Sequence, residues 1–373
     1  MLPFPVRAAF RFPRVRILAI LALATVAQAL ELGPGSPELN VSGLGWHTEE
    51  APILRRLPRR LQGTFRAPVW DLAQHPSGGR FRFRTDSARL TLSAANPDTS
   101  TMHHMTTVGQ SGFDLYVDGL YRGSAWPDAQ GRIRKEWTLG PAGRLREITL
   151  YLPLYKPVTL ERIVLDDGAH VAAPTPFVRP GPVVYYGSSI TQGGCAENPG
   201  LSYPAILGRR LGMDFVNLGF SGNGLGEPAV AEAVAELDAA AFVLDHWANP
   251  SPEVYRDTLP GFVDILRRHH PKTPILVVGP FWLPSENGSE EARDSQERKR
   301  SIGRSFVETR RKAGDRNLVF VDGRDMISRE QASGYVDGVH PNSLGFAHCA
   351  DGLEPHLRKV LRLGRRRDMD TGR

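Results

Sequence analysis

Between residues 183 and 361 the chain alternates short apolar runs with segments long enough to form helices. The apolar runs are VVYY (183–186), FVNL (215–218), AFVL (241–244), PILVV (274–278) and LVFV (318–321). The helix-length segments are 203–211, 227–237, 253–268, 290–313 and 343–361. Short continuous apolar runs are typical of strands that are buried on both faces, and their alternation with helices predicts βαβ units. We therefore expect residues 183–361 to form a three-layer α/β domain around a doubly wound parallel sheet.

The preceding segment, residues 31–172, has a different pattern, in which apolar and polar residues alternate over short runs. Examples are FRFRT (81–85), LTLSA (90–94), FDLYV (113–117) and ITLYL (148–152). Alternation with a period of two predicts half-buried strands, and Asp118-Gly119 is a signal for the turn between two of them. The short and regular spacing of these runs predicts an N-terminal β-sandwich domain.

A proline-rich stretch separates the two patterns. Residues 172–182 read AAPTPFVRPGP and contain four prolines, which fix φ and lack a backbone donor. We expect residues 173–182 to form a stiff linker between the domains. At the other end of the chain, residues 362–373 are basic and are expected to form a solvated tail.

The N-terminal 29 residues have the composition of a secretory signal peptide. Four arginines precede an apolar stretch at 17–27, and Ala27-Gln28-Ala29 is a small-residue cleavage site. The apolar stretch is short for a bilayer span, so we expect cleavage, export to the periplasm or beyond, and no stable membrane insertion. An uncleaved anchor is the alternative. Removing the four arginines lowers the formal net charge from +6 to +2, so no nucleic-acid partner is expected.

The chain contains two cysteines, Cys195 and Cys349. Two cysteines in a chain of 373 residues do not form a disulfide scaffold. In an oxidising compartment they could pair with each other or remain two separate buried thiols, and the sequence leaves both alternatives open.

Polar residues follow the apolar runs of the predicted parallel sheet, where functional groups of such sheets gather. Ser189 follows the first run, and Asp337 and His340 lie beyond the fifth. A serine hydroxyl is a weak nucleophile until a base takes its proton, and histidine is suited to that role near neutral pH. Asp337 lies three residues before His340 and could orient the imidazole. These three residues predict acyl-transfer chemistry.

A tetrahedral intermediate in acyl transfer also requires hydrogen-bond donors for its negatively charged oxygen. The backbone amides of Ser189 and Gly222 and the side-chain amide of Asn249 are suitable donors at the ends of three apolar runs. Glycine at position 222 would let the backbone approach the substrate closely, because it has no side chain. We therefore expect an oxyanion hole formed by Ser189, Gly222 and Asn249.

Taken together, these segments resemble the conserved blocks of the SGNH/GDSL hydrolase superfamily. Ser189, Gly222, Asn249 and His340 take the places of its four namesake residues, and Asp337 completes the Asp-x-x-His element. The segment GFDLY (112–116) resembles the GxDLY signature of an N-terminal β-domain found in one branch of that superfamily. The resemblance implies a β-sandwich followed by a three-layer α/β esterase domain.

Two blocks depart from the superfamily pattern. The usual Gly-Asp-Ser is Gly187-Ser188-Ser189, so the carboxylate beside the nucleophile is missing. The residue before the serine has no part in the proton relay, so we expect this change to be tolerated. The usual Gly-x-Asn-Asp block is present only as the segment DHWANP (245–250), which identifies Asn249 by its position.

Several aromatic residues and histidines near these blocks are candidates for substrate contact. His246, Trp247 and Trp282 follow apolar runs, and a tryptophan there could stack on a sugar ring. Packing in the core is the alternative for all three. His103 and His104 lie between two methionines, but neighbouring side chains on a strand point to opposite faces, so no metal site is expected. One of these histidines could instead face the esterase domain and line its pocket.

The sequence thus predicts an exported serine esterase that uses neither a metal nor another cofactor. Export, a β-sandwich partner and tryptophans near the site favour a short acyl group, such as acetyl, on a carbohydrate or small-molecule ester. A lipase, lysophospholipase or thioesterase is the alternative among enzymes. A different class of protein, a non-catalytic glycan-binding protein on an esterase fold, would be expected to lack a member of the triad. The oligomeric state does not follow from the sequence.

Overall fold

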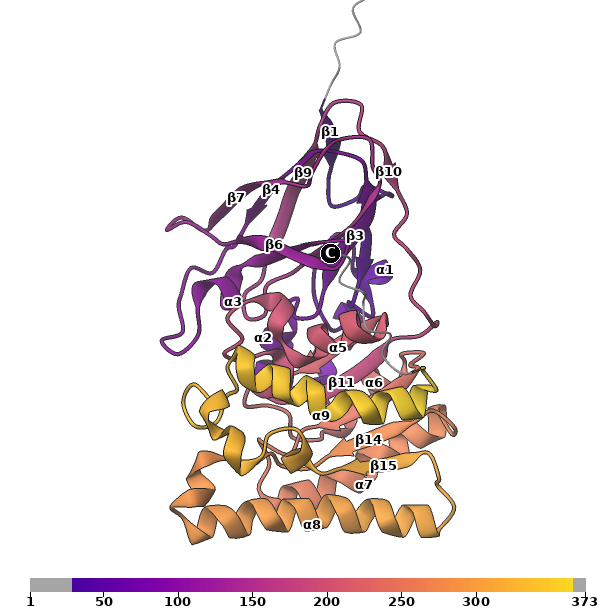
Figure 1. Cartoon of the computed structure of the whole chain (residues 1–373). Helices are drawn as coiled ribbons and strands as arrows, with labels where there is room; N and C mark the ends of the chain where they lie inside the picture. The colour runs from indigo at the N-terminus through magenta and orange to yellow at the C-terminus, as the bar shows by residue number, and fades with distance from the viewer. Residues whose placement is uncertain (1–28, 365–373) are drawn as a thin grey trace, which may run out of the picture.

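The computed structural model of the chain describes residues 29–364, which form a β-sandwich stacked on a three-layer α/β unit (Figure 1). The predicted signal peptide, except for Ala29, lies outside the described residues. Residues 365–373 of the predicted basic tail also lie outside them.

Two antiparallel sheets make up the N-terminal part. The first has the order β1 (Leu30–Leu32), β9 (Thr159–Leu165), β4 (Arg89–Ala95) and β7 (Arg132–Thr138). The second has the order β10 (Val171–Ala172), β3 (Arg80–Thr85), β8 (Arg146–Tyr151), β5 (Phe113–Val117) and β6 (Leu120–Ala125), and β2 (Asn40–Ser42) also pairs with β3. The predicted β-sandwich is confirmed.

The turn between β5 and β6 follows directly from its two residues. Asp118 and Gly119 have φ angles of 50° and 79°, which place both in the left-handed region. A two-residue turn of this kind matches the right-handed twist of paired strands, and glycine enters it without steric cost. The predicted turn signal at Asp118-Gly119 therefore closes a β-hairpin.

The apolar core is not confined to either part of the molecule. One cluster fills the space between the two antiparallel sheets. A larger cluster surrounds the parallel sheet and includes Leu57, Val69, Tyr151 and Tyr155 of the N-terminal part. Because burial of apolar area is the main stabilising contribution to folding, this shared core fixes the β-sandwich against the α/β unit.

The C-terminal part is built on a parallel sheet with the order β12 (Phe215–Gly219), β11 (Val183–Gly187), β13 (Ala241–Asp245), β14 (Ile275–Val278) and β15 (Leu318–Val321). The first strand in sequence, β11, lies between β12 and β13 and pairs in register with both. All residues of these three strands are buried, as expected for a sheet covered on both faces. The predicted doubly wound α/β fold is confirmed.

Helices cover both faces of the parallel sheet. Helix α5 (Tyr203–Leu211) packs against α9 (Ser343–Leu361) on one face, and α6 (Pro228–Ala235), α7 (Pro252–His269) and α8 (Glu290–Lys312) pack in sequence on the other (Figure 1). Short helices complete the structure: α1 (His47–Glu50), α2 (Ala67–Ala73), α3 (Thr107–Ser111) and α4 (Ser189–Gln192). Within the described residues, no helix is both long and apolar enough to cross a membrane.

The longer helices begin where the local sequence provides a cap. The side-chain oxygens of Ser251, Ser289 and Asn342 accept hydrogen bonds from the backbone N–H three residues later, at the starts of α7, α8 and α9. Such caps satisfy amide groups that the helix itself leaves unpaired. The cap at Asn342 matters most for the site, because α9 begins directly after the segment that carries Asp337 and His340.

Candidate active site

Ser189 lies at the junction of β11 and α4. Strand β11 ends at Gly187, and Ser189 is the first residue of α4. The Ser188 side chain accepts a hydrogen bond from the Ile190 N–H at 3.2 Å and caps the helix. A serine therefore serves as the helix cap at the position where the superfamily usually has aspartate.

The location of Ser189 follows from the sheet topology. The strand order reverses at β11, because β12 lies on one side of it and β13 on the other. In open α/β sheets, ligands bind at the carboxyl ends of the strands at such a switch point. Ser189 thus lies where the fold places functional groups.

Asp337 and His340 lie in a short hairpin that precedes α9. Tyr335 pairs with Pro341 across it, and the Val336 N–H donates to the His340 carbonyl at 2.9 Å. The Asp337 Oδ1 atom accepts hydrogen bonds from the His340 N–H at 2.8 Å and the Val339 N–H at 3.0 Å. The hairpin therefore fixes the Asp337 carboxylate relative to the His340 backbone.

A continuous line of hydrogen bonds joins the three predicted residues. His340 Nε2 lies 2.8 Å from Ser189 Oγ, and His340 Nδ1 lies 2.8 Å from Asp337 Oδ2. Burial alone would raise the pKa of Asp337, but the hydrogen bonds from His340 and Val339 outweigh it and lower that pKa to about 2. The carboxylate is therefore ionised at neutral pH. It can hold the Nδ1–H tautomer, which leaves Nε2 free to accept the serine proton.

The three predicted oxyanion donors come from three segments that follow neighbouring strands of the parallel sheet, β11, β12 and β13. The Ser189 N–H precedes the hydrogen-bond ladder of α4, so the helix leaves it free. Gly222 is exposed in the loop after β12 with φ of 68°, and no described atom lies within 4 Å of the place where its Cβ would be. The Asn249 Oδ1 atom accepts from the Gly224 N–H at 3.0 Å, which leaves the Asn249 amide NH₂ as a donor.

Gly224 explains how Asn249 is held close to the nucleophile. A Cβ at Gly224 would lie 2.4 Å from the Gly187 carbonyl oxygen and 3.1 Å from the Ser188 nitrogen. Only glycine permits this contact with the strand that leads into Ser189. Because the Asn249 side chain is hydrogen-bonded to the Gly224 N–H, it is held against the turn that carries Ser189.

Asp245, at the end of β13, is a buried carboxylate beneath the nucleophile turn. It accepts hydrogen bonds from the Thr191 hydroxyl at 3.0 Å, the Tyr203 hydroxyl at 2.9 Å and the Trp247 indole N–H at 2.7 Å. Burial raises its pKa to about 7, and these hydrogen bonds oppose the rise. Asp245 therefore ties α4 and α5 to the end of the sheet.

Replacement of Asp245 by asparagine should change how stability depends on pH. The folded-state pKa of about 7 lies above the ordinary value of 3.8, so the folded wild type binds a proton more tightly than the unfolded chain. Its stability should therefore fall as pH rises from 5 to 8, by on the order of 2 kcal/mol from this group. The Asp245→Asn variant should lack this pH-dependent contribution to the free energy of unfolding. Urea unfolding of both proteins at pH 5 and pH 8 measures the two slopes, and equal slopes would contradict the prediction.

His246 and Trp247 lie in the core, so the predicted substrate contacts at these two residues are corrected in favour of packing. They are 0% and 1% exposed, respectively. His246 packs against the rings of Tyr186 and Tyr255, and burial lowers its pKa to about 3, so it is neutral. Trp247 packs edge-on against Phe281. Both side chains are buried because they follow β13, the central strand of the sheet, and point into its helix-covered faces.

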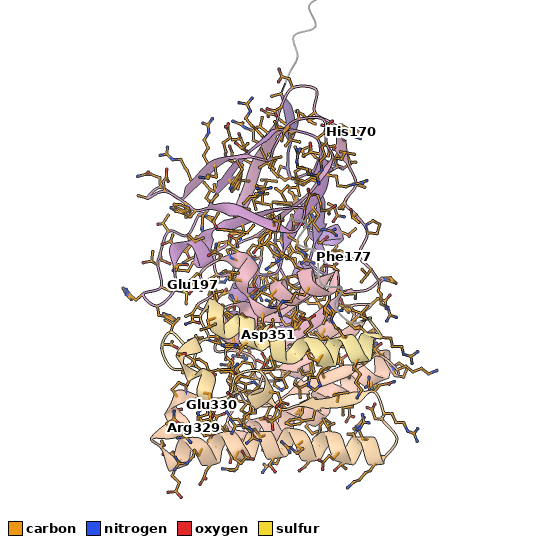
Figure 2. The ribbon with its side chains drawn as sticks, in the orientation of Figure 1. His170, Phe177, Glu197, Arg329, Glu330 and Asp351 are labelled. Carbon is orange, nitrogen blue, oxygen red and sulfur yellow. The ribbon has the colours of Figure 1, made fainter. Side chains whose placement is uncertain are left out.

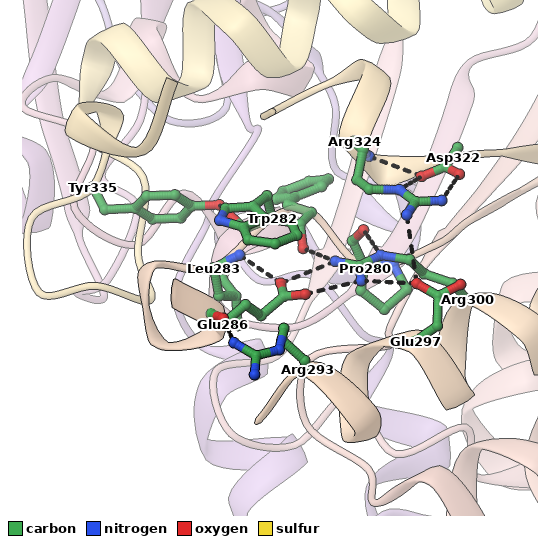
Figure 3. A network of polar contacts seen from close by, with 11 residues as sticks. Pro280, Trp282, Leu283, Glu286, Arg293, Glu297, Arg300, Asp322, Arg324 and Tyr335 are labelled. Carbon is green, nitrogen blue, oxygen red and sulfur yellow. Dashed lines mark hydrogen bonds and ion pairs between the residues drawn. The ribbon is translucent and has the colours of Figure 1, made fainter. Parts of the chain in front are cut away.

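Trp282 is only partly buried and lies in a loop that a buried ion pair fixes (Figure 3). The Arg300 guanidinium of α8 pairs with Glu286 at 3.0 Å and donates to the Phe281 carbonyl at 2.7 Å. The Trp282 carbonyl accepts from the Tyr335 hydroxyl at 2.9 Å, which links this loop to the hairpin that carries His340. Contact between Trp282 and substrate stays a prediction.

The N-terminal part contributes directly to the surroundings of Ser189. The Tyr155 hydroxyl donates to the Ser189 carbonyl at 3.2 Å, and Gln192 of α4 donates to the Leu154 carbonyl at 3.0 Å. Arg56, 1% exposed, donates to the carbonyls of Asn217 and Gly219 at the end of β12. These residues lie far from the motifs in sequence, so local patterns did not identify them.

The aspartate of the GFDLY segment also joins the two parts. Asp114 is 0% exposed and accepts hydrogen bonds from the Ser124 hydroxyl at 2.6 Å and the Gly200 N–H at 2.7 Å. Its other partner is the Asn198 side-chain amide at 3.3 Å. The segment around Gly200 follows α4, so Asp114 anchors the β-sandwich to the loop that leads away from the nucleophile.

His103 and His104 lie in a turn, so the expectation that they occupy a strand was wrong. The His104 ring lies 5.6 Å from the His340 ring, which places it beside the candidate site. The Cys195 thiol donates to the His104 carbonyl at 3.3 Å. Cys195 and Cys349 are both buried and both free, so the alternative of two separate thiols is the one observed.

Two large surface hollows lie away from these residues. One of about 760 Å³ lies beside Arg304, Phe320 and His356, and one of about 710 Å³ lies on the β-sandwich beside Trp126. Ser189, His340 and Asp337 line neither hollow. The candidate site is therefore identified by its hydrogen-bonded chemistry and its place in the fold.

The α/β unit has a serine at the switch point of its sheet, and a histidine before its last helix is hydrogen-bonded to that serine. This combination defines an SGNH/GDSL-type hydrolase. A model of the GDSL-like lipase/acylhydrolase family matches residues 181–358, and a model of the N-terminus of SGNH-hydrolase-type esterases matches residues 34–171. A crystal structure from Bacteroides ovatus ATCC 8483, assigned as a GDSL-like lipase, is 33% identical, with a TM-score of 0.81. The match covers 90% of this chain and 98% of that one. The chain therefore belongs to the GDSL-like lipase/acylhydrolase family.

More distant structures share the fold. The salicylyl-acyltransferase SsfX3 of a tetracycline biosynthetic pathway is 22% identical with a TM-score of 0.75, and the match covers 89% of this chain and 97% of that one. A family two carbohydrate esterase from Cellvibrio japonicus is 16% identical with a TM-score of 0.61, covering 90% and 99%. The comparison with curated protein sequences found no match.

Proposed function

We propose that this hydrolase cleaves short acyl esters on carbohydrate through an acyl-enzyme formed on Ser189. The observation that carries the proposal is the line of two 2.8 Å hydrogen bonds from Ser189 through His340 to Asp337. His340 takes the Ser189 proton while Oγ attacks the ester carbonyl, and Asp337 stabilises the imidazolium that forms. The oxygen of the tetrahedral intermediate receives hydrogen bonds from the Ser189 and Gly222 backbone amides and the Asn249 side chain.

The second half of the reaction reuses the same groups. His340 donates its proton to the leaving alcohol, and the acyl group remains on Ser189 Oγ. A water molecule then loses a proton to His340 and attacks the acyl carbonyl, which releases the carboxylic acid and restores the Ser189 hydroxyl. The site needs no metal for either step, because the base, the nucleophile and the oxyanion donors are all side-chain or backbone groups.

The proposed substrate class rests on the relatives and on the architecture. Structures with this fold include family two carbohydrate esterases and an acetyl xylan esterase of Butyrivibrio proteoclasticus, at 13% identity for the latter. At such identity they support the fold alone, and the substrate is our inference. Trp282 is partly buried, and its carbonyl is hydrogen-bonded to Tyr335 of the His340 hairpin, so we expect its ring to stack on a sugar ring of the substrate. Export through residues 1–29 would bring the enzyme to extracellular or periplasmic glycans.

Two measurements test the proposal. A fluorophosphonate probe should label the purified protein at Ser189, whereas a non-catalytic glycan-binding protein would not be labelled. Acetate release from a panel of acetylated polysaccharides should exceed hydrolysis of long-chain lipid esters, lysophospholipids and acyl thioesters. Preferential cleavage of long acyl chains would favour the lipase alternative. Transfer of the acyl group to an added alcohol in place of water would favour an acyltransferase.

Asn249→Asp should lower kcat by about 10²- to 10³-fold, the usual effect of removing one oxyanion donor. Aspartate keeps an oxygen that can accept the Gly224 N–H, which Asn249 accepts at 3.0 Å, so the loop should keep its conformation. The variant loses only the NH₂ donor and places a negative charge beside the oxyanion. Steady-state kinetics with p-nitrophenyl acetate give kcat and KM. A kcat within threefold of wild type in a folded variant would remove Asn249 from the oxyanion hole.

A further inference from the structure

Three potential metal ligands from distant parts of the chain meet beside the nucleophile. One ligand atom from each of His104, Cys195 and His340 lies within 4.8 Å of the other two. His104 comes from the turn before α3, Cys195 from the loop after α4, and His340 from the hairpin before α9. We propose that this cluster binds Zn²⁺ and that the bound ion switches the esterase off. The regulatory part of this inference rests on the proposed function.

The ligand set and its spacing suit zinc. Thiolate and imidazole are the usual zinc ligands, with bonds of about 2.3 and 2.0 Å, so ligand atoms around one tetrahedral ion lie about 3.5 Å apart. The cluster must therefore contract by roughly 1 Å to close around an ion. The His104 side chain can supply this movement because the residue is exposed, whereas Cys195 is buried in the protein. Binding converts the Cys195 thiol to a thiolate and releases its proton to solvent.

The turn that carries His104 is held in place by a buried side chain. The Gln110 side chain, 1% exposed, accepts from the Met102 N–H at 2.9 Å and donates to the Met105 carbonyl at 2.7 Å. The Thr106 hydroxyl donates to the Glu197 carbonyl at 2.6 Å, which ties the turn to the α/β unit. Glu197 lies on the side of the molecule where α9 begins (Figure 2). These contacts direct the turn toward the candidate site.

The conformation of Cys195 is a second and independent observation. Its φ is 71°, in the left-handed region that glycine adopts freely and that costs other residues about 1 kcal/mol or more. Gly193, two residues earlier, also has a positive φ, of 107°, and is a glycine, whereas the left-handed position at 195 carries a thiol. The left-handed backbone directs Cys195 Sγ to the His104 carbonyl, at 3.3 Å, and into the cluster.

Metal binding and catalysis compete for one atom of His340. Asp337 holds Nδ1 at 2.8 Å, so the atom left for an ion is Nε2, which lies 2.8 Å from Ser189 Oγ. An imidazole nitrogen that donates its lone pair to Zn²⁺ cannot accept the serine proton. Bound zinc should therefore abolish turnover reversibly, and a chelator should restore it.

The site is tested first by binding, without reference to activity. Isothermal titration of ZnCl₂ into the Ser189→Ala protein should show one saturable site per chain, and Co²⁺ should give the visible absorption of a tetrahedral thiolate complex. His104→Ala and Cys195→Ser, each in that background, should weaken zinc binding at least tenfold. His103→Ala is the matched control, because it removes the neighbouring exposed histidine from the same turn, and it should bind zinc as tightly as the parent. No saturable binding, or equal weakening by His103→Ala and His104→Ala, would overturn the site.

Inhibition is then measured as the ratio of esterase rates with and without Zn²⁺, at the lowest concentration that saturates the wild type, so that any change in basal rate divides out. Wild type and His103→Ala should lose at least 90% of turnover and recover it with EDTA, whereas His104→Ala should keep most of its own rate. An active enzyme that zinc does not inhibit would overturn the regulatory inference and leave the proposed function intact. Zinc binding to a protein that cleaves no ester would contradict the proposed function and leave the site intact.

Discussion

Ser189→Ala should lower the rate of ester hydrolysis by at least about 10⁴-fold, because it removes the atom that forms the acyl-enzyme. Ser189 Oγ has His340 Nε2 as its hydrogen-bond partner at 2.8 Å, so its loss leaves one imidazole nitrogen that water can satisfy. The fold should therefore be retained, with a thermal midpoint close to that of the wild type. Fluorophosphonate labelling and p-nitrophenyl acetate kinetics on the folded variant measure the effect.

Ser188→Ala is the matched control, since it makes the same chemical change one residue earlier. The Ser188 side chain accepts the Ile190 N–H at 3.2 Å and caps α4. Its loss should reduce stability by about 1 kcal/mol, as for other helix caps, while labelling persists. Labelling that survives Ser189→Ala but is lost in Ser188→Ala would assign the nucleophile to Ser188 and contradict the proposed mechanism.

The parallel sheet could be predicted from the sequence because its strands are buried on both faces. The apolar run at 318–321 coincides with β15, and the helix-length segments at 203–211 and 343–361 coincide with α5 and α9. A strand that contacts helices on both faces is apolar at nearly every position, which gives a recognisable run of apolar residues. Asn217 of β12 is a buried polar exception. The order of the strands in the sheet could not be predicted in the same way, because crossover connections of similar length permit several strand orders.

The candidate site was predictable because parallel strands all present their carboxyl ends at one edge. Ser189 and Asn249 follow different strands of the sheet, and His340 lies in the hairpin beyond β15. The structure brings Ser189 and His340 to 2.8 Å, although they are 151 residues apart in the chain. Position after an apolar run does not distinguish exposed residues from buried ones, however. For this reason the sequence pattern predicts substrate contacts at His246 and Trp247, which also follow β13, whereas both residues are buried.

Contacts between the β-sandwich and the nucleophile turn had no local signal. Tyr155 and Arg56 are separated from the motifs by long stretches of chain, and their partners are backbone carbonyls of Ser189, Asn217 and Gly219. Every residue has a backbone carbonyl, so the type of a residue does not reveal whether its carbonyl accepts such a hydrogen bond. The segment around His104 forms a turn and not the strand that its sequence predicts, so the position of His104 beside His340 did not follow from the sequence.

Asp337→Asn should lower kcat by about 10³- to 10⁴-fold without abolishing fluorophosphonate labelling. The variant keeps an oxygen for the backbone N–H groups of Val339 and His340, which Asp337 accepts at 3.0 and 2.8 Å. Its NH₂ group, however, faces Nδ1 of His340. A donor at that place favours the tautomer with the proton on Nε2, and such an imidazole cannot take the Ser189 proton. The negative charge that stabilises the imidazolium is lost as well.

The control for the change in charge is Asp351→Asn. Asp351 is exposed on α9 (Figure 2) and pairs with Arg210 at 2.7 Å, and surface ion pairs of this kind contribute little to stability. It should leave kcat unchanged, whereas Asp337→Asn should slow both turnover and the rate of labelling. The distinction from Ser189→Ala is then qualitative: with Asp337→Asn the probe still reacts with Ser189, only more slowly. A kcat within tenfold of wild type would show that His340 is oriented without Asp337 and that the site works as a Ser189–His340 dyad.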